Sequence, residues 1–132
     1  MADLKAMPAT AGYGGWKNQL GNITGPISWT GVTLRALMRL VGGGSSVTVV
    51  ASDGYSENLS ANDVAGAVTT YDPVTGEVIT GIDIIAIVAY AKGGGTLSSG
   101  EGPLRLAFVS SAQNQVTDSA MWVKKVVELR IH

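Results

Sequence analysis

Two stretches near the C-terminus, Gly102-Pro103-Leu104-Arg105-Leu106 and Trp122-Val123-Lys124-Lys125-Val126, carry most of the information about the fold. Pro103 fixes the backbone at the start of a strand, where no ladder donor is needed. The indole of Trp122 is large enough to anchor a core. These features predict a strand over residues 104–109, a polar loop over 110–119 and a closing strand over 123–131. In the closing strand, alternation places Val127, Leu129 and Ile131 on one face and Glu128 and Arg130 on the other.

Upstream, residues 33–41 give the clearest helical pattern. Leu34, Leu37, Met38 and Val41 recur at the spacing of a single helix face. Thr33 can cap the start of this helix, and the glycines at 42–44 can end it.

The rest of the chain favours short strands joined by turns. Residues 47–51 and 55–59 flank the turn Ser52-Asp53-Gly54, which predicts a hairpin. Ser60 is expected to cap a short helical turn with Asp63 three residues further on. Residues 67–71 and 77–80 flank a turn at 72–76, and the apolar run 83–90 predicts a central strand. The Gly-rich residues 8–31 are interpreted as turns and short strands, with Gly12, Gly14, Gly15, Gly21 and Gly25 permitting positive φ.

These elements predict one domain over residues 1–132 of the α+β class. Its core is a mostly β mixed sheet with one clear helix and short helical turns. The 132 residues include 45% hydrophobic and 14% charged residues, enough apolar material for a packed core. No linker or internal repeat divides the sequence.

Composition excludes several functional classes. The net charge is −1 with no basic block, which argues against nucleic-acid binding. The chain has no cysteine, so it can form no disulfide, thiolate nucleophile or cysteine-ligated metal site. Its one histidine is the last residue, His132, so neither a Ser-His-Asp triad nor a multi-histidine zinc site is expected. The longest apolar run, 82–91, is too short to span a membrane.

Several motifs occur in the order typical of one family. Trp29-Thr30-Gly31-Val32-Thr33-Leu34, Ala51-Ser52-Asp53-Gly54-Tyr55, the strand ending in Ala89-Tyr90, Gly102 to Leu106, and Trp122-Val123 follow one another at compatible spacings. Together they resemble the molybdopterin-binding domain of sulfite-oxidase-type oxidoreductases. The resemblance implies that family's fold. The Gly-Gly-Trp-Lys-Asn segment at 14–18 and Gly25-Pro26 are similar to stand-alone or tandem modules of this fold in surface proteins of archaea and anaerobic bacteria.

Two departures from the family pattern concern its chemistry. The resemblance implies a metal-ligating cysteine upstream of Trp29, and none is present. It also implies a lysine four residues before Trp122 and often another directly before it, both near the cofactor phosphate. These positions hold Asp118 and Met121 here, while the expected Ser119 is retained. A carboxylate beside a phosphate repels it. Both the metal anchor and the phosphate anchor are therefore expected to be damaged.

The candidate cofactor-binding or ligand-binding residues are Arg105, Ser119, Lys17, Asn18 and Tyr55, around the polar loop 110–119. The alternative interpretation of that loop is a solvated surface segment. Asp83 on an apolar strand would need a partner if buried, and Arg105 could supply a structural ion pair. No catalytic and no metal-binding residue is predicted.

The leading hypothesis is a non-catalytic binding or structural module that uses no cofactor. It would belong to a surface or secreted protein, with a small-molecule ligand or neighbouring domains as partners, no nucleic acid and no membrane span. A cytoplasmic protein is the other location considered. The first alternative is a genuine molybdopterin-binding oxidoreductase domain with non-cysteine metal ligation, in which Ser119 and Arg105 help to hold the pterin. The second is a structural repeat without a ligand, which predicts no pocket of ligand size.

Overall fold

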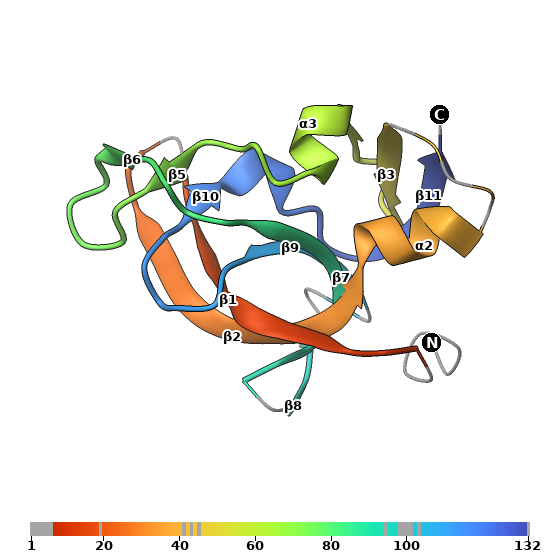
Figure 1. Ribbon diagram of the computed structural model, residues 1–132, viewed down its shortest axis with the longest axis horizontal. Helices are drawn as coiled ribbons and strands as arrows, with labels where there is room; N and C mark the ends of the chain where they lie inside the picture. The colour runs from red at the N-terminus through yellow and green to blue at the C-terminus, as the bar shows by residue number, and fades with distance from the viewer. Residues whose placement is uncertain are drawn as a thin grey trace.

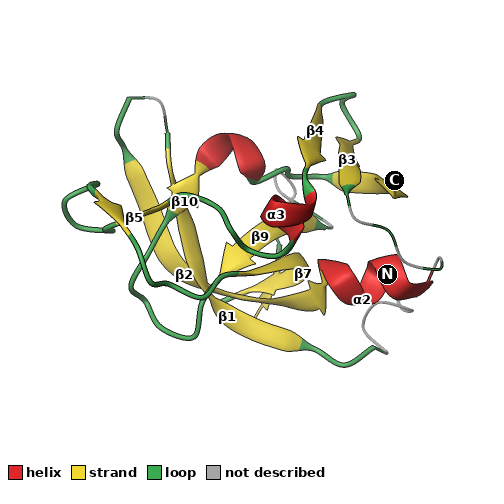
Figure 2. Ribbon diagram, turned by 45° about the horizontal axis from the view of Figure 1, so that its top comes forward, coloured by secondary structure: helices red, strands yellow, loops and turns green. Residues whose placement is uncertain are grey.

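The computed structural model describes residues 7–18, 20–40, 42, 44, 46–93, 95–97, 102 and 104–131. Strands dominate the described chain, and the helices are short (Figures 1 and 2). The elements in chain order are β1 (Thr10–Lys17), β2 (Ile23–Thr33), α2 (Leu34–Leu40), β3 (Val47–Ala51), β4 (Ser56–Leu59), α3 (Ala61–Val64), β5 (Thr70–Tyr71), β6 (Val78–Ile79), β7 (Ile85–Lys92), β8 (Gly95–Thr96), β9 (Arg105–Val109), β10 (Thr117–Asp118), the 3₁₀ turn η1 (Ser119–Met121) and β11 (Val126–Ile131).

The larger sheet is mixed and strongly curled. Its strand order is β10-β1-β2-β7-β8, and β9 also pairs with β7. The pairs are antiparallel except for β1 with β10, which is parallel. The curl brings the end of β9 back to β1, where Tyr13 and Ser110 exchange backbone hydrogen bonds of 2.8 and 2.9 Å. Figure 1 shows β1, β2, β7 and β9 wrapping around a common interior.

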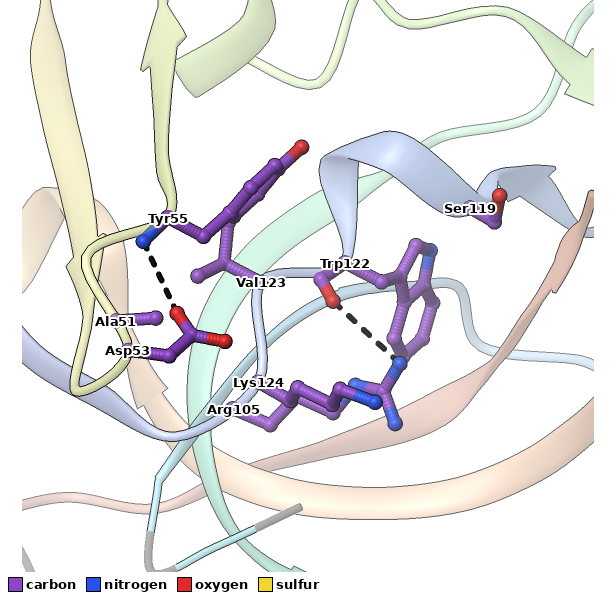
Figure 3. A pocket seen from close by; sticks show the side chains of 8 residues that line it. All are labelled: Ala51, Asp53, Tyr55, Arg105, Ser119, Trp122, Val123 and Lys124. Carbon is purple, nitrogen blue, oxygen red and sulfur yellow. Dashed lines mark hydrogen bonds between the residues drawn. The ribbon is translucent and has the colours of Figure 1, made fainter. Parts of the chain in front are cut away.

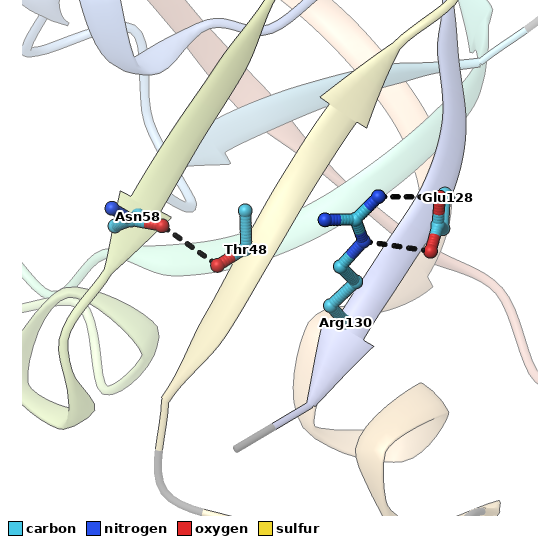
Figure 4. A network of polar contacts seen from close by, with 4 residues as sticks. All are labelled: Thr48, Asn58, Glu128 and Arg130. Carbon is cyan, nitrogen blue, oxygen red and sulfur yellow. Dashed lines mark hydrogen bonds and ion pairs between the residues drawn. The ribbon is translucent and has the colours of Figure 1, made fainter.

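A second, three-stranded sheet has the order β11-β3-β4. Its surface carries polar contacts: Thr48 bonds Asn58 across β3 and β4 at 2.7 Å, and Arg130 pairs with Glu128 on β11 at 2.8 Å (Figure 4). The two sheets meet where residues 123–126 run beside the start of β9. There Leu106 N donates to Val123 O and Val126 N donates to Leu104 O.

One hydrophobic core joins the two sheets and the helices. Trp29, Ile87 and Phe108 from the curled sheet are fully buried, as is Val49 from the small sheet. Trp122 is 3% exposed and packs on Trp29, so the prediction that Trp122 anchors the core is confirmed.

The predicted α+β class is wrong, because the described chain is β-rich with two small helices. The helix α2 has seven residues and α3 has four. The largest difference lies at residues 8–31, which were expected to form turns and short strands. They form β1 and the 11-residue β2, the longest strand described.

The glycines of β1 and β2 permit close packing of strands. A Cβ on Gly14 would lie 2.2 Å from Phe108 O, and one on Gly15 would lie 2.0 Å from Thr24 O. Of the five glycines expected to permit positive φ, only Gly21 and Gly25 adopt it. At Gly12, Gly14 and Gly15 the absence of a side chain allows neighbouring backbone to approach closely. A segment rich in glycine, which is typical of turns, therefore forms a pair of strands here.

Both predicted caps are present. Ala36 N donates to Thr33 Oγ1 at 3.2 Å, and Ser60 and Asp63 form a reciprocal capping box around α3. Gly42 has the positive φ expected at the end of a helix. Val41, Gly43, Pro103 and His132, which also figured in the predictions, lie outside the described residues.

Two other predictions fail for local reasons. Asp83 is exposed and precedes β7, so it is not a buried carboxylate. Arg105 lies at the opposite end of the β7–β9 pair, facing Ala89, which removes the basis for the expected ion pair between Asp83 and Arg105.

In β11 the register shifts between Val126 and Glu128, and Val127 is consequently 63% exposed. The bulge breaks the simple alternation that had placed Val127 beside Leu129.

Candidate functional site

A candidate site is a pocket of about 300 Å³ at the junction of the two sheets, which brings charged and aromatic side chains together. The turn after β3 supplies one side, and β9 with the segment after β10 supplies the other (Figure 3). Apolar and charged side chains both contribute to its wall. The lining residues are Ala51, Asp53, Tyr55, Arg105, Ser119, Trp122, Val123 and Lys124.

Arg105 is a cation held in place by aromatic rings. Its side chain is 8% exposed, and its guanidinium lies 4.2 Å from the centroid of the Trp16 ring. The same group lies 5.8 Å from the Trp122 ring, and its NH2 is 3.4 Å from the Trp122 carbonyl oxygen (Figure 3). Stacking of this kind is worth about 0.5–2 kcal/mol. Arg105 therefore presents a positive charge whose position is fixed before any ligand arrives.

The rings around Arg105 are themselves fixed. Trp16 and Trp122 have ring centroids 5.2 Å apart, and Trp29 lies 5.3 Å from Trp122. Trp29 Nε1 donates to Gly14 O at 3.0 Å, and Trp122 Nε1 donates to Thr117 Oγ1 at 2.7 Å. Because both indole donors are satisfied within the protein, these rings can be buried without an unpaired polar atom.

The opposite side of the pocket is built by the turn between β3 and β4. Asp53 Oδ1 accepts a 3.0 Å hydrogen bond from Tyr55 N, which fixes the turn. The Tyr55 ring is 47% exposed, and its hydroxyl donates to Glu57 Oε2 at 3.2 Å. Partial burial, then the nearby Glu57 carboxylate, raises the pKa of Tyr55 above its usual value, so the phenol stays neutral.

Lys124 and Ser119 complete the polar lining. Lys124 is exposed and forms no ion pair within the described part of the chain. Ser119 is half-buried at the start of η1, and its hydroxyl likewise has no hydrogen-bond partner among the residues described. Two cations, Arg105 and Lys124, thus face the pocket with one carboxylate, Asp53. Charged groups of both signs therefore line the pocket, together with a hydroxyl that no described residue engages.

Three of the five predicted site residues come together here: Arg105, Ser119 and Tyr55. Lys17 and Asn18 have structural roles instead. Lys17 Nζ donates to Gly76 O at 2.9 Å and lies 4.5 Å from the centroid of the Tyr71 ring, tying β1 to the β5–β6 hairpin. Asn18 Oδ1 accepts from Leu20 N and Asn22 N within its own turn.

The polar loop 110–119 contributes little to the pocket, and much of it is buried. Gln115 is fully buried, and its Nε2 donates to Tyr13 O and to Ser110 Oγ, both at 3.1 Å. Residues 111–114 are exposed, as the interpretation of a solvated surface segment predicts, whereas 115–117 are buried. Asp118, expected to repel a phosphate, accepts a 2.8 Å hydrogen bond from the Tyr71 hydroxyl and does not line the pocket.

The lining residues missed from the sequence are Ala51, Asp53, Trp122, Val123 and Lys124. All five lie in the motifs at 51–55 and 122–126, which were interpreted mainly as determinants of the fold. No sequence signal marks Lys124 as a lining residue, because the bridge that places it opposite Arg105 forms only in the folded chain.

The residues present do not suit a metal cofactor that needs a thiolate. The chain has no cysteine, and no group of three or more His, Cys, Asp or Glu side chains gathers within the described residues. The charged groups of the pocket suit an anion better than a transition metal.

No protein-family model and no curated protein matches this chain. Within the described residues, no helix has the length and apolar character needed to cross a membrane.

Proposed function

We propose that this domain is a non-catalytic module that binds a small ligand through an anionic group of that ligand, in the pocket between its two sheets. The observation that carries the proposal is Arg105, a guanidinium held between Trp16 and Trp122 and facing a pocket of about 300 Å³. A pre-positioned cation loses little conformational entropy when it binds an anion. Lys124 adds charge, and Ser119 adds a hydroxyl that can donate.

The chemistry around the pocket supports binding rather than catalysis. No histidine lies among the described residues, so Ser119 has none there to act as a general base. The pocket size supports a ligand, since ligand pockets measure about 300–1,000 Å³. This volume counts against the hypothesis of a structural repeat that binds nothing. The resemblance to molybdopterin-binding domains and the location at a cell surface remain predictions.

Titration of the purified domain with 3-phenylpropionate, benzoate and inorganic phosphate tests the proposal. Trp122 lines the pocket and reports binding through tryptophan fluorescence, with calorimetry as a second measurement. We expect saturable binding of at least one probe at low salt. Lys124→Gln should weaken that binding about fivefold, the effect of one partly exposed charge pair.

Lys125→Gln is the matched control, because Lys125 is the adjacent lysine and does not line the pocket. Its binding should equal that of the native protein. Saturable binding of no probe, or an equal loss in both lysine variants, would contradict the proposal. Stoichiometric molybdenum or pterin in the purified domain would favour the oxidoreductase alternative instead.

A further inference from the structure

We infer that the ligand is a zwitterion of the α-amino acid class with an apolar side chain. This inference rests on the proposed function and narrows it. The observation behind it is that the pocket presents charges of opposite sign that do not pair with one another. Asp53 stands on the side of the β3–β4 turn, and Arg105 and Lys124 come from the other wall (Figure 3).

The Asp53 carboxylate is available to a ligand. Its Oδ1 accepts from Tyr55 N, whereas its Oδ2 accepts no hydrogen bond and forms no ion pair within the described chain. Lys124 also lacks an ion-pair partner there, so the two opposite charges line one pocket yet lie too far apart to pair. A ligand that carries both a carboxylate and an ammonium group can satisfy both sides at once.

Asp53 also discriminates among anions. A ligand with two negative charges would bring one of them near Asp53, where like charges repel. A ligand with one carboxylate and one ammonium replaces that repulsion with attraction. The Asp53 side chain is exposed, so the gain is that of a solvated charge pair, about fivefold in affinity.

The remaining wall of the pocket is apolar. Ala51, Val123, the Tyr55 ring and the Trp122 indole surround the space between the charged groups. Aromatic rings and aliphatic side chains favour an apolar or aromatic ligand body. The volume of about 300 Å³ is at the small end of ligand pockets, which fits an amino acid better than a nucleotide-sized compound.

Three probes of one shape separate the contributions of the two charges. L-phenylalanine carries both groups, 3-phenylpropionate lacks the ammonium and phenethylamine lacks the carboxylate. Each is titrated into the native domain and into Asp53→Asn. Asn retains the oxygen that accepts from Tyr55 N, so the turn should persist. Asp83→Asn is the matched control, because Asp83 is an exposed aspartate that does not line the pocket.

We expect L-phenylalanine to bind about fivefold more tightly than 3-phenylpropionate, with phenethylamine the weakest. Asp53→Asn should abolish the advantage of phenylalanine, and Asp83→Asn should preserve it. If 3-phenylpropionate binds as tightly as phenylalanine, or if the advantage survives in Asp53→Asn, the zwitterion inference is overturned while anion binding stands. If no probe binds, or if phenethylamine binds best, both the inference and the proposed function fail.

Discussion

Replacing Gly31 with alanine tests whether missing side chains set the packing of the curled sheet. A Cβ at Gly31 would lie 2.1 Å from Val88 O and 2.6 Å from Ala89 Cα, both backbone atoms of β7. Ordinary contact begins at about 3.4 Å, so β2 and β7 would have to separate by more than 1 Å locally. The two strands belong to the buried centre of the sheet, where overpacking costs about 3 kcal/mol at the upper end of its usual range.

Urea denaturation followed by tryptophan fluorescence measures this cost. With an m-value of about 1.5 kcal/mol/M, a loss of about 3 kcal/mol lowers the urea midpoint by about 2 M. Gly95→Ala is the matched control. Gly95 is also a strand glycine without positive φ, and the nearest atom to its Cβ would be 3.9 Å away. The control should change stability by less than about 0.5 kcal/mol. Similar midpoints for the two variants would refute the close-packing argument.

Two further predictions concern a helix cap and the hydrogen bond between Tyr71 and Asp118. Ser60→Ala removes the capping box of α3 and should lower the free energy of unfolding by about 1 kcal/mol. The control Ser56→Ala on β4 should change it little. Equal urea midpoints for the two variants would contradict this prediction. The hydrogen bond to Asp118, followed by burial, raises the pKa of Tyr71. This hydrogen bond therefore stabilises the folded state below pH about 10. The stabilisation is lost as pH rises through the pKa that Tyr71 has in the folded protein. Above pH 10 the native protein should lose more thermal stability than Tyr71→Phe. The control Tyr13→Phe should behave like the native protein. Parallel pH profiles of thermal stability for all three proteins would refute this prediction.

Local signals predicted the parts of the fold whose cause lies within a few residues. The Thr33 and Ser60 caps and the β3 strand depend on neighbours in the sequence, and all are present. The β1–β2 hairpin could not be predicted in the same way. Its glycines are defined by contacts with Phe108 and Val88, which lie far along the chain. A glycine that avoids a clash and a glycine that makes a turn are identical in the sequence.

The candidate site shows the same difference between local and long-range causes. Arg105, Ser119 and Tyr55 were predicted through motif positions and do line the pocket. Lys17 and Asn18 belong to the same kind of motif, but local hydrogen bonds engage Asn18 and the distant Gly76 engages Lys17. Only the folded structure shows which polar side chains are already engaged within the protein.

Trp122 belongs to both the core and the pocket, and this determines which substitutions can report on function. Its ring packs on Trp16, Trp29 and Phe108, and its carbonyl accepts from Arg105. Truncating Trp122 or Arg105 would therefore destabilise the core and remove the proposed anion contact together, so a loss of binding would have two explanations. Lys124 and Asp53 are exposed, and their charges can be removed without opening a cavity. Binding losses in Lys124→Gln and Asp53→Asn at unchanged stability would consequently report on the pocket alone.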